Sequence, residues 1–160
     1  MTITPGDAIP SATLSVMTAD GPAAVSTDEL FKGKKVALFG LPGAFTPTCS
    51  AQHVPGYLLN ADALKAKGID GIVCLSVNDA FVMGAWSKDQ GVGDAIVMAA
   101  DGSAELTRAM GLELDLTARG MGIRCDRFSM IVDDGVVTTI NREAPGEFRI
   151  SGAETMLGQL

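Results

Sequence analysis

The sequence predicts an α/β protein in which helices flank a central mixed β-sheet, and two observations carry this prediction. Short apolar runs typical of buried strands alternate with helical segments through the first two-thirds of the chain. Farther along, two apolar runs flank Asp133-Asp134-Gly135, and an Asp-Gly pair between such runs indicates a β-hairpin. Strand–helix repeats pair strands in parallel, whereas a hairpin pairs them antiparallel. The sheet is therefore mixed, and the chain ends with a hairpin and a helix.

The strands are predicted from apolar runs that are too short to be helices. The charged residues Lys34 and Lys35 mark the beginning of the first run, which starts at Val36. The predicted strands cover residues 36–40, 72–77 and 95–99, followed by the hairpin strands 128–132 and 136–140.

Capping residues and glycines mark the helices. Residues 54–64 carry apolar side chains at helical spacing, and Gly68 ends this helix. Pro55 and Gly56 lie inside the pattern and predict a kink or break there. Two further helices are predicted to begin at capping boxes, Ser26–Glu29 and Ser151–Glu154, and the second of these includes Met156, Leu157 and Leu160. Asn78-Asp79 begins another helix, which runs through about Asp89. Ser103 begins one that runs through Met110 and is closed by Gly111.

Length and charge limit the function. We expect the 160 residues to form one domain, residues 1–160. The net charge of −7 disfavours binding to nucleic acid or to an anionic membrane surface. The longest apolar stretch, residues 36–45, is broken by Gly and Pro and is too short to span a bilayer. The first ten residues lack the pattern of a secretory signal, so we expect a cytoplasmic protein.

The cysteines narrow the chemistry further. Cys49, Cys74 and Cys125 are widely spaced, and His53 is the only histidine. Zinc ligands normally come in closely spaced pairs, so we expect no metal, and no other cofactor is indicated. An odd number of cysteines, in a chain whose first ten residues lack the pattern of a secretory signal, argues against a disulfide scaffold and for a reducing compartment.

The segment from Gly40 to Ser50 carries the clearest chemical signal. A buried strand ends near Leu41, a Pro/Gly-rich loop follows, and a helix begins near Cys49. Unpaired N–H groups and the helix dipole at such a position favour a thiolate over a thiol. Thr46 and Thr48 supply hydroxyls close by, while Pro42 and Pro47 stiffen the loop. On these residues alone, Cys49 is either a nucleophile or small apolar filler.

The pattern Pro42-x-x-x-Thr46-x-x-Cys49 resembles the active-site signature of peroxiredoxins, which are thiol peroxidases with a thioredoxin-like fold. The resemblance to the type II, or peroxiredoxin-five, subfamily runs from about Gly6 to Leu160. It is most specific in residues 42–50, His53-Val54-Pro55-Gly56, residues 76–83 and Arg127-Phe128-Ser129-Met130.

The resemblance implies a role for each residue of the motif. Cys49 is the nucleophile, and its thiolate attacks hydrogen peroxide or a small organic hydroperoxide to give a sulfenic acid. Thr46 holds the peroxide, Pro42 covers the sulfur, and Arg127 stabilises negative charge beside it. His53, four residues after Cys49, is expected to be a structural partner that tunes the cysteine rather than a metal ligand.

The sulfenic acid must then be reduced. Some members of the subfamily carry a resolving cysteine before the last helix, but residues 147–152 contain none. Cys74 is a possible resolving cysteine or buried filler. Because it lies in a predicted buried strand, an external thiol is favoured: glutathione, glutaredoxin or thioredoxin. Cys125 is expected to be a spectator on the same face of an extended segment as Arg127. Arg124 is a second, weaker basic candidate.

The sequence alone leaves two functions of different class open. The first is an antioxidant peroxidase, favoured because Pro42, Thr46, Cys49 and Arg127 occur together. The second is a redox-responsive binding or sensor protein, which would need only a reactive cysteine. The resemblance also implies a homodimer formed through loops near Phe45, residues 77–83 and residues 119–121.

Overall fold

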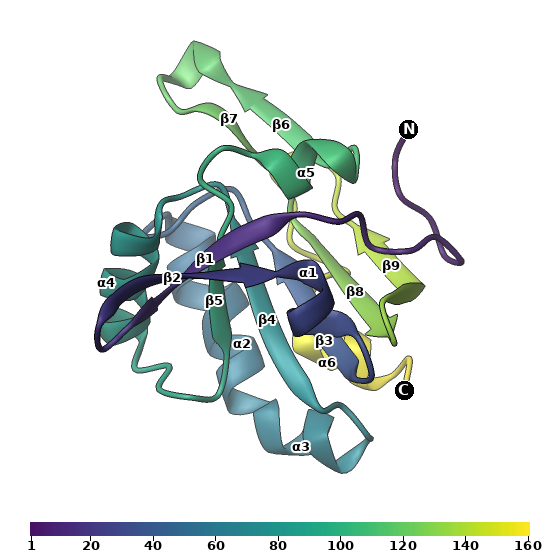
Figure 1. Cartoon of the computed structure of the whole chain (residues 1–160). Coiled ribbons are helices and arrows are strands. Elements are labelled where there is room, and N and C mark those ends of the chain that lie inside the picture. The colour runs from purple at the N-terminus through teal and green to yellow at the C-terminus, as the bar shows by residue number, and fades with distance from the viewer.

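A computed structural model describes the whole chain, residues 1–160, and is built on one seven-stranded sheet (Figure 1). The strand order is β2-β1-β5-β4-β3-β8-β9. Strands β3, β4 and β5 run parallel to one another, and the outer strands are antiparallel, so the predicted mixed sheet is confirmed. The strands are β1 (Thr13–Thr18), β2 (Gly21–Ser26), β3 (Lys35–Gly40), β4 (Gly71–Ser76), β5 (Val97–Ala100), β8 (Phe128–Asp133) and β9 (Val136–Arg142).

The register between β3 and β8 brings two distant parts of the sequence together. The two strands are antiparallel neighbours, and Gly40 at the end of β3 pairs with Phe128 at the start of β8. The loop that leaves β3 therefore lies beside the residues that lead into β8. Arg127, directly before Phe128, is brought to the loop that precedes Cys49.

Helices cover both faces of the sheet, and each face has its own core. Successive residues of a strand point to opposite faces, so Phe39 and Leu41 pack into one cluster and Val36 and Leu38 into the other. The first cluster is covered by α2 (Val54–Leu59), α3 (Ala61–Ala66), α4 (Ala80–Gln90) and α6 (Ala153–Leu157), and the second by α1 (Thr27–Phe31) and α5 (Glu105–Ala109).

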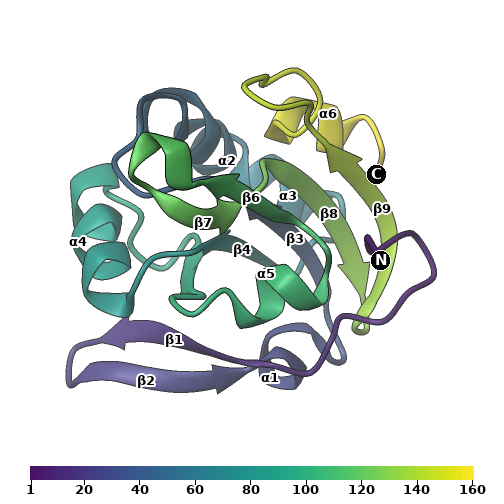
Figure 2. The ribbon, with the colours of Figure 1, turned by 90° about the horizontal axis from the view of Figure 1, so that it is seen from above.

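A small separate hairpin projects above the end of the sheet where β3 and β4 end (Figure 1). It consists of β6 (Glu113–Leu116) and β7 (Gly122–Cys125), joined through the 3-10 turn η2 (Thr117–Arg119). Figure 2 shows the same hairpin from above, lying over the sheet between α4 and β8. Neither this hairpin nor the β1–β2 hairpin was predicted, because their strands are partly exposed and lack a continuous apolar run.

Two predicted helix caps are confirmed. The hydroxyl of Ser26 accepts the N–H of Glu29 at 3.1 Å, and the carboxylate of Asp79 accepts the N–H of Val82 at 2.8 Å. The predicted hairpin is also present, with Asp134 and Gly135 in the left-handed conformation that its turn requires.

Two other caps are wrong. Helix α5 begins at Glu105 with Ala104 as its N-cap, and Asp101 rather than Ser103 accepts the N–H of Thr107, at 2.8 Å. Helix α6 begins at Ala153 with Gly152 as its N-cap and ends at Leu157, so it excludes Leu160. The hydroxyl of Ser151 does not cap it, because that hydroxyl donates to the Glu143 carboxylate at 2.7 Å. In both cases a buried carboxylate outside the predicted capping pattern, Asp101 or Glu143, is the stronger hydrogen-bond partner.

None of the helices has the length and apolar composition needed to cross a lipid bilayer.

The close approach of β3 and β8 gives a stability prediction. A Cβ atom on Gly40 would lie 2.1 Å from the Phe128 ring, so Gly40→Ala should lower the free energy of unfolding by about 2 kcal/mol or more. Gly71→Ala is the matched control in β4, where an added Cβ meets nothing within 4 Å. Urea unfolding measures both. Equal effects of the two substitutions would contradict the packing seen at Gly40.

Candidate active site

The loop after β3 turns the chain back toward the sheet and begins a helix at Pro47. Phe45 adopts the left-handed conformation, with φ of 64°, and its side chain is exposed. The Thr46 hydroxyl donates to the Gly43 carbonyl at 2.7 Å, and the Thr46 carbonyl accepts the N–H of Ser50 at 3.0 Å. These bonds fix the turn that delivers Cys49 to the interior, where the whole residue is buried.

Cys49 opens a π-helical segment, Cys49–His53, which runs directly into α2. The N–H of Val54 donates to the Cys49 carbonyl, one residue farther back than in an α-helix. Pro55 follows at once and has no N–H to donate. The expected irregularity at Pro55 and Gly56 is therefore a wide turn just before them, and the helix continues through both residues.

Arg127 contacts the cysteine sulfur directly. Its Nη2 donates to Cys49 Sγ at 3.1 Å, across 78 residues of sequence. A guanidinium keeps its positive charge at any physiological pH, and an interior of low dielectric constant strengthens its interaction with a thiolate. The β3–β8 register produces this contact.

His53 holds the other side of the same guanidinium. Arg127 Nη1 lies 2.8 Å from His53 Nδ1, and His53 Nε2 lies 3.0 Å from the Ser151 carbonyl oxygen. Because a guanidinium can only donate, Nδ1 accepts, and the ring proton sits on Nε2 and is donated to Ser151. Burial, reinforced by the charge of Arg127, lowers the pKa of His53 from 6.5 to about 3, so the ring is neutral.

Aromatic rings enclose this group. Phe39 stacks on Tyr57 with ring centres 4.0 Å apart, and the His53 ring lies 4.8 Å from Phe39 and 5.0 Å from Phe148. Phe148 also lies under the Arg127 guanidinium, at 5.7 Å. The rings pack around the fully buried His53, and Phe148 adds a cation–π attraction to the Arg127 guanidinium.

Thr46 and Pro42 lie in the loop that leads to Cys49, and both are half-buried. The Thr46 hydroxyl hydrogen is committed to the Gly43 carbonyl, which leaves the oxygen lone pairs as acceptors. Arg124 makes no hydrogen bond to the sulfur: its Nε donates to the Met121 carbonyl at 2.8 Å and its Nη1 to the Val77 carbonyl at 3.5 Å. It ties the β6–β7 hairpin to the loop that follows β4.

The two remaining cysteines lie in different cores. Cys74 is fully buried in β4 and packs into the same cluster as Cys49; burial raises the pKa of its thiol, and the neighbouring Cys49 adds to the rise. Cys125 is fully buried at the end of β7 and packs into the other cluster, where burial raises the pKa of its thiol. The expectation that Cys125 and Arg127 share a face is wrong. Strand alternation stops at Cys125, and the chain turns there into β8.

Several residues of the site were not identified from the sequence. Glu143, Phe148 and the Ser151 carbonyl reach it from the segment between β9 and α6, and Tyr57 reaches it from α2. The only local signal was the Ser151–Glu154 capping box, which pointed to a different role. Contacts of this kind depend on the tertiary structure.

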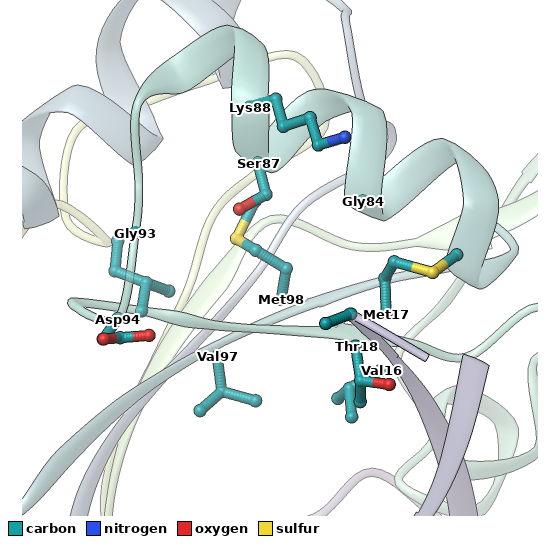
Figure 3. Close-up of a pocket in the computed structure, with 12 residues that line it drawn as sticks. Val16, Met17, Thr18, Gly84, Ser87, Lys88, Gly93, Asp94, Val97 and Met98 are labelled. Carbon is teal, nitrogen blue, oxygen red and sulfur yellow. The ribbon is translucent and has the colours of Figure 1, made fainter. Parts of the chain in front are cut away.

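Other features offer no competing centre. No group of three or more His, Cys, Asp or Glu side chains is arranged to hold a metal ion. A cavity of about 670 Å³ lies between helix α4 and the two strands β1 and β5. Figure 3 shows Met17, Lys88, Asp94 and Met98 among its lining residues. None of the predicted site residues lines it.

A cysteine is buried near the start of a helix, after the loop that leaves a parallel strand, and it lies against an arginine that directly precedes the neighbouring strand. This arrangement defines a thioredoxin-like protein built for thiol chemistry. The Redoxin family matches residues 4–157, and the chain belongs to that family as a peroxiredoxin, a thiol-dependent peroxidase.

Individual relatives agree with the type II subfamily. Peroxiredoxin-2C of Arabidopsis thaliana is 50% identical over 159 residues, covering 99% of this chain and 98% of that protein. Among solved structures, reduced Prx3 of Vibrio vulnificus in complex with hydrogen peroxide has a TM-score of 0.94 at 53% identity, covering 99% of both chains. Peroxiredoxin 5 of Alvinella pompejana has a TM-score of 0.86 at 34% identity, covering 97% of this chain and 96% of that one. The predicted family and fold are thus confirmed.

The neutral state of His53 predicts a pH dependence of stability. Its pKa is near 6.5 in the unfolded chain and about 3 in the folded one, so between these values the unfolded state binds more protons. The free energy of unfolding should therefore fall on acidification from pH 6.5 to 4.5, by up to about 1.4 kcal/mol per pH unit. Urea unfolding at several pH values measures the slope, and His53→Gln should flatten it. Parallel profiles for the two proteins would contradict a neutral, buried His53.

Proposed function

We propose that Cys49 is the nucleophile of this peroxidase. Its thiolate attacks one oxygen of the peroxide, an S–O bond forms, and the O–O bond breaks. The bonding electron pair leaves with the distal oxygen, which takes a proton and departs as water or an alcohol. Cys49 is oxidised to a sulfenic acid and the peroxide is reduced by two electrons. The observation that carries the proposal is the 3.1 Å contact of Arg127 Nη2 with the buried Cys49 sulfur.

Arg127 acts at both ends of this step. Before it, the guanidinium stabilises the thiolate. As the O–O bond breaks, negative charge moves from sulfur to the leaving oxygen, and the same fixed cation faces it without reorganising. Its second partner, the neutral His53, fixes the guanidinium but does not neutralise it.

Thr46 and Pro42 complete the site from the loop. Because the Thr46 hydroxyl already donates to Gly43, its oxygen is free to accept the O–H of the peroxide and to align the reacting oxygen with the sulfur. Pro42 shields the sulfur from bulk solvent. The complete burial of Cys49 favours small substrates, hydrogen peroxide and small organic hydroperoxides. The hydrogen peroxide bound to Vibrio vulnificus Prx3 supports this choice.

An external thiol reduces the sulfenic acid. One thiol of glutathione, glutaredoxin or thioredoxin attacks the Cys49 sulfur, expels water and forms a mixed disulfide. A second thiol then attacks that disulfide and releases Cys49. Cys74 is a poorer resolving residue: it is fully buried inside β4, its raised pKa keeps it protonated, and a disulfide would require the Cys49 helix to unwind.

The protein forms a homodimer through the surface beside this loop. The exposed ring of Phe45 lies on that surface, 6.4 Å from Trp86 of α4, and Phe81 in the first turn of α4 is exposed as well. Arg124 joins the β6–β7 hairpin to the same region through Val77. Exposed aromatic side chains gathered in this way are typical of an interface. A solution mass of twice 16.5 kDa at micromolar concentration is expected, and a monomeric mass would contradict the proposal.

A reducing compartment, the cytoplasm, suits the three unpaired cysteines. Relatives are named for the chloroplast in rice and for the mitochondrion in Arabidopsis thaliana, so the same fold is not confined to one compartment.

The role of Arg127 is tested by Arg127→Lys. A lysine keeps the charge but replaces the planar fork, which uses Nη1 for His53 and Nη2 for Cys49, by a single nitrogen. The second-order rate constant for oxidation by hydrogen peroxide should therefore fall by roughly 10²-fold or more. Stopped-flow measurement of single-turnover oxidation gives this constant. Arg108→Lys, a change at an exposed arginine, is the matched control and should leave it unchanged. A wild-type rate in Arg127→Lys would exclude this role.

The route of reduction is tested by chemical mapping. One equivalent of hydrogen peroxide is added to the fully reduced protein, the reaction is quenched, and peptides are mapped without reductant. One added oxygen on the Cys49 peptide is the expected product, with Cys74 and Cys125 unmodified. A Cys49–Cys74 disulfide would instead mean internal resolution, and an unmodified Cys49 at neutral pH would overturn the catalytic proposal.

A further inference from the structure

Glu143, directly after β9, is a buried carboxylate without a cationic partner. Its residue is only 6% exposed, and it takes part in no salt bridge. Burying a carboxylate is costly unless other groups compensate its charge. Here the compensation comes from four donors on one short segment: the N–H groups of Arg149 (2.9 Å), Ile150 (2.8 Å) and Ser151 (2.8 Å), and the Ser151 hydroxyl (2.7 Å).

These four hydrogen bonds, which we call the Glu143 clasp, fix the backbone before α6. Three successive N–H groups and the Ser151 hydroxyl converge on one carboxylate, which fixes the position of Ser151. The Ser151 carbonyl, which belongs to the next peptide unit, accepts from two donors of the active-site helix, His53 Nε2 and the Tyr57 hydroxyl, each at 3.0 Å. Burial opposes ionisation of Glu143, but the hydrogen bond from the Ser151 hydroxyl and those from the three N–H groups outweigh it and lower the pKa.

The same segment holds the catalytic arginine from two sides. Through Ser151 it fixes the position and tautomer of His53, which accepts from Arg127 Nη1 at 2.8 Å. Through Phe148 it places an aromatic face 5.7 Å from the guanidinium carbon. Arg127 forms no salt bridge with any carboxylate, so its orientation depends on these two neutral partners. A direct carboxylate partner would compete with the Cys49 thiolate for the positive charge.

We infer that Glu143 is a positioning residue of the peroxidase: by clasping the segment 149–151 it orients Ser151, His53 and Phe148, and through them aims Arg127 at the Cys49 sulfur. The inference rests on the proposed roles of Cys49 and Arg127. It assigns a task in the reaction to a residue that touches neither the peroxide nor the reacting sulfur.

The kinetic test compares two substitutions in one segment. Glu143→Gln removes the charge of the clasp while keeping its shape, and Glu147→Gln removes an exposed charge that contacts only the Arg149 side chain. In stopped-flow oxidation by hydrogen peroxide, Glu143→Gln should lower the second-order rate constant by about 10-fold or more, and Glu147→Gln should not change it. If Glu143 acts through Arg127, the loss should shrink to less than about twofold in an Arg127→Lys background. An equal loss in both backgrounds would overturn the inference.

A second readout needs no activity. His53 is the only histidine, so labelling histidine with ¹⁵N gives NMR signals from this ring alone. The native protein should show the Nε2–H tautomer, neutral down to acidic pH, and Glu147→Gln should match it. Glu143→Gln should show a mixture of tautomers or a ring that titrates closer to neutral pH. An unchanged tautomer and titration in Glu143→Gln would overturn the inference.

Folding and function are separated by further measurements. Circular dichroism checks that Glu143→Gln is folded. Should it not fold, Ser151→Ala removes one donor of the clasp, keeps the carbonyl, and should produce the same changes at smaller size; no change in either readout would overturn the inference. If the native protein itself failed to react with hydrogen peroxide, the proposed function would fail, while the histidine spectrum would still decide whether Glu143 orients His53.

Discussion

The pairing of β3 with β8 brings the Arg127 guanidinium into contact with the Cys49 sulfur, and the rest of the site is arranged around that contact. Cys49 follows β3 and Arg127 precedes β8, and the antiparallel register that pairs Gly40 with Phe128 brings the two together. The missing side chain at Gly40 lets the Phe128 ring approach the strand closely enough for this register. Packing between β3 and β8 therefore places the guanidinium beside the cysteine sulfur.

The surroundings of Arg127 leave its charge available. Apart from the Cys49 sulfur, its side-chain partners are the neutral ring of His53 and the face of Phe148, and the Phe39–Tyr57 stack packs behind the His53 ring. The one carboxylate nearby, Glu143, is separated from the guanidinium by the Ser151 peptide and the His53 ring. Hydrogen bonds hold the guanidinium in place, and its positive charge faces the Cys49 sulfur.

The three thiols of the chain differ because of where the fold places them. Cys49 begins a π-helical turn and faces a fixed cation, whereas Cys74 and Cys125 lie in strands within opposite cores, where burial favours the protonated thiol. The π-helical turn ends just before Pro55, so the helix that carries Cys49 contains an irregular turn at that cysteine. Wide turns of this kind are often found at functional sites.

Much of the fold and part of the site could be predicted from the sequence. Apolar periodicity located β3, β4, β8 and β9, because burial on a sheet imposes a pattern over a few residues. The helix caps at Ser26 and Asp79 were also predictable, since both partners lie within one turn.

Cys49 at a strand–helix junction was a candidate on local chemistry, and the resemblance to peroxiredoxins supplied Arg127. The residues alone left Arg127 as a charged strand end. Only the tertiary structure decided that the carboxylates of Asp101 and Glu143, rather than the predicted capping groups, form the hydrogen bonds near the starts of α5 and α6. It also decided that Cys125 and Arg127 do not share a face. The series of contacts from Glu143 through Ser151 and His53 to Arg127 likewise appears only in the folded protein. Those outcomes depend on strand register and on contacts between residues many positions apart, which no local pattern encodes.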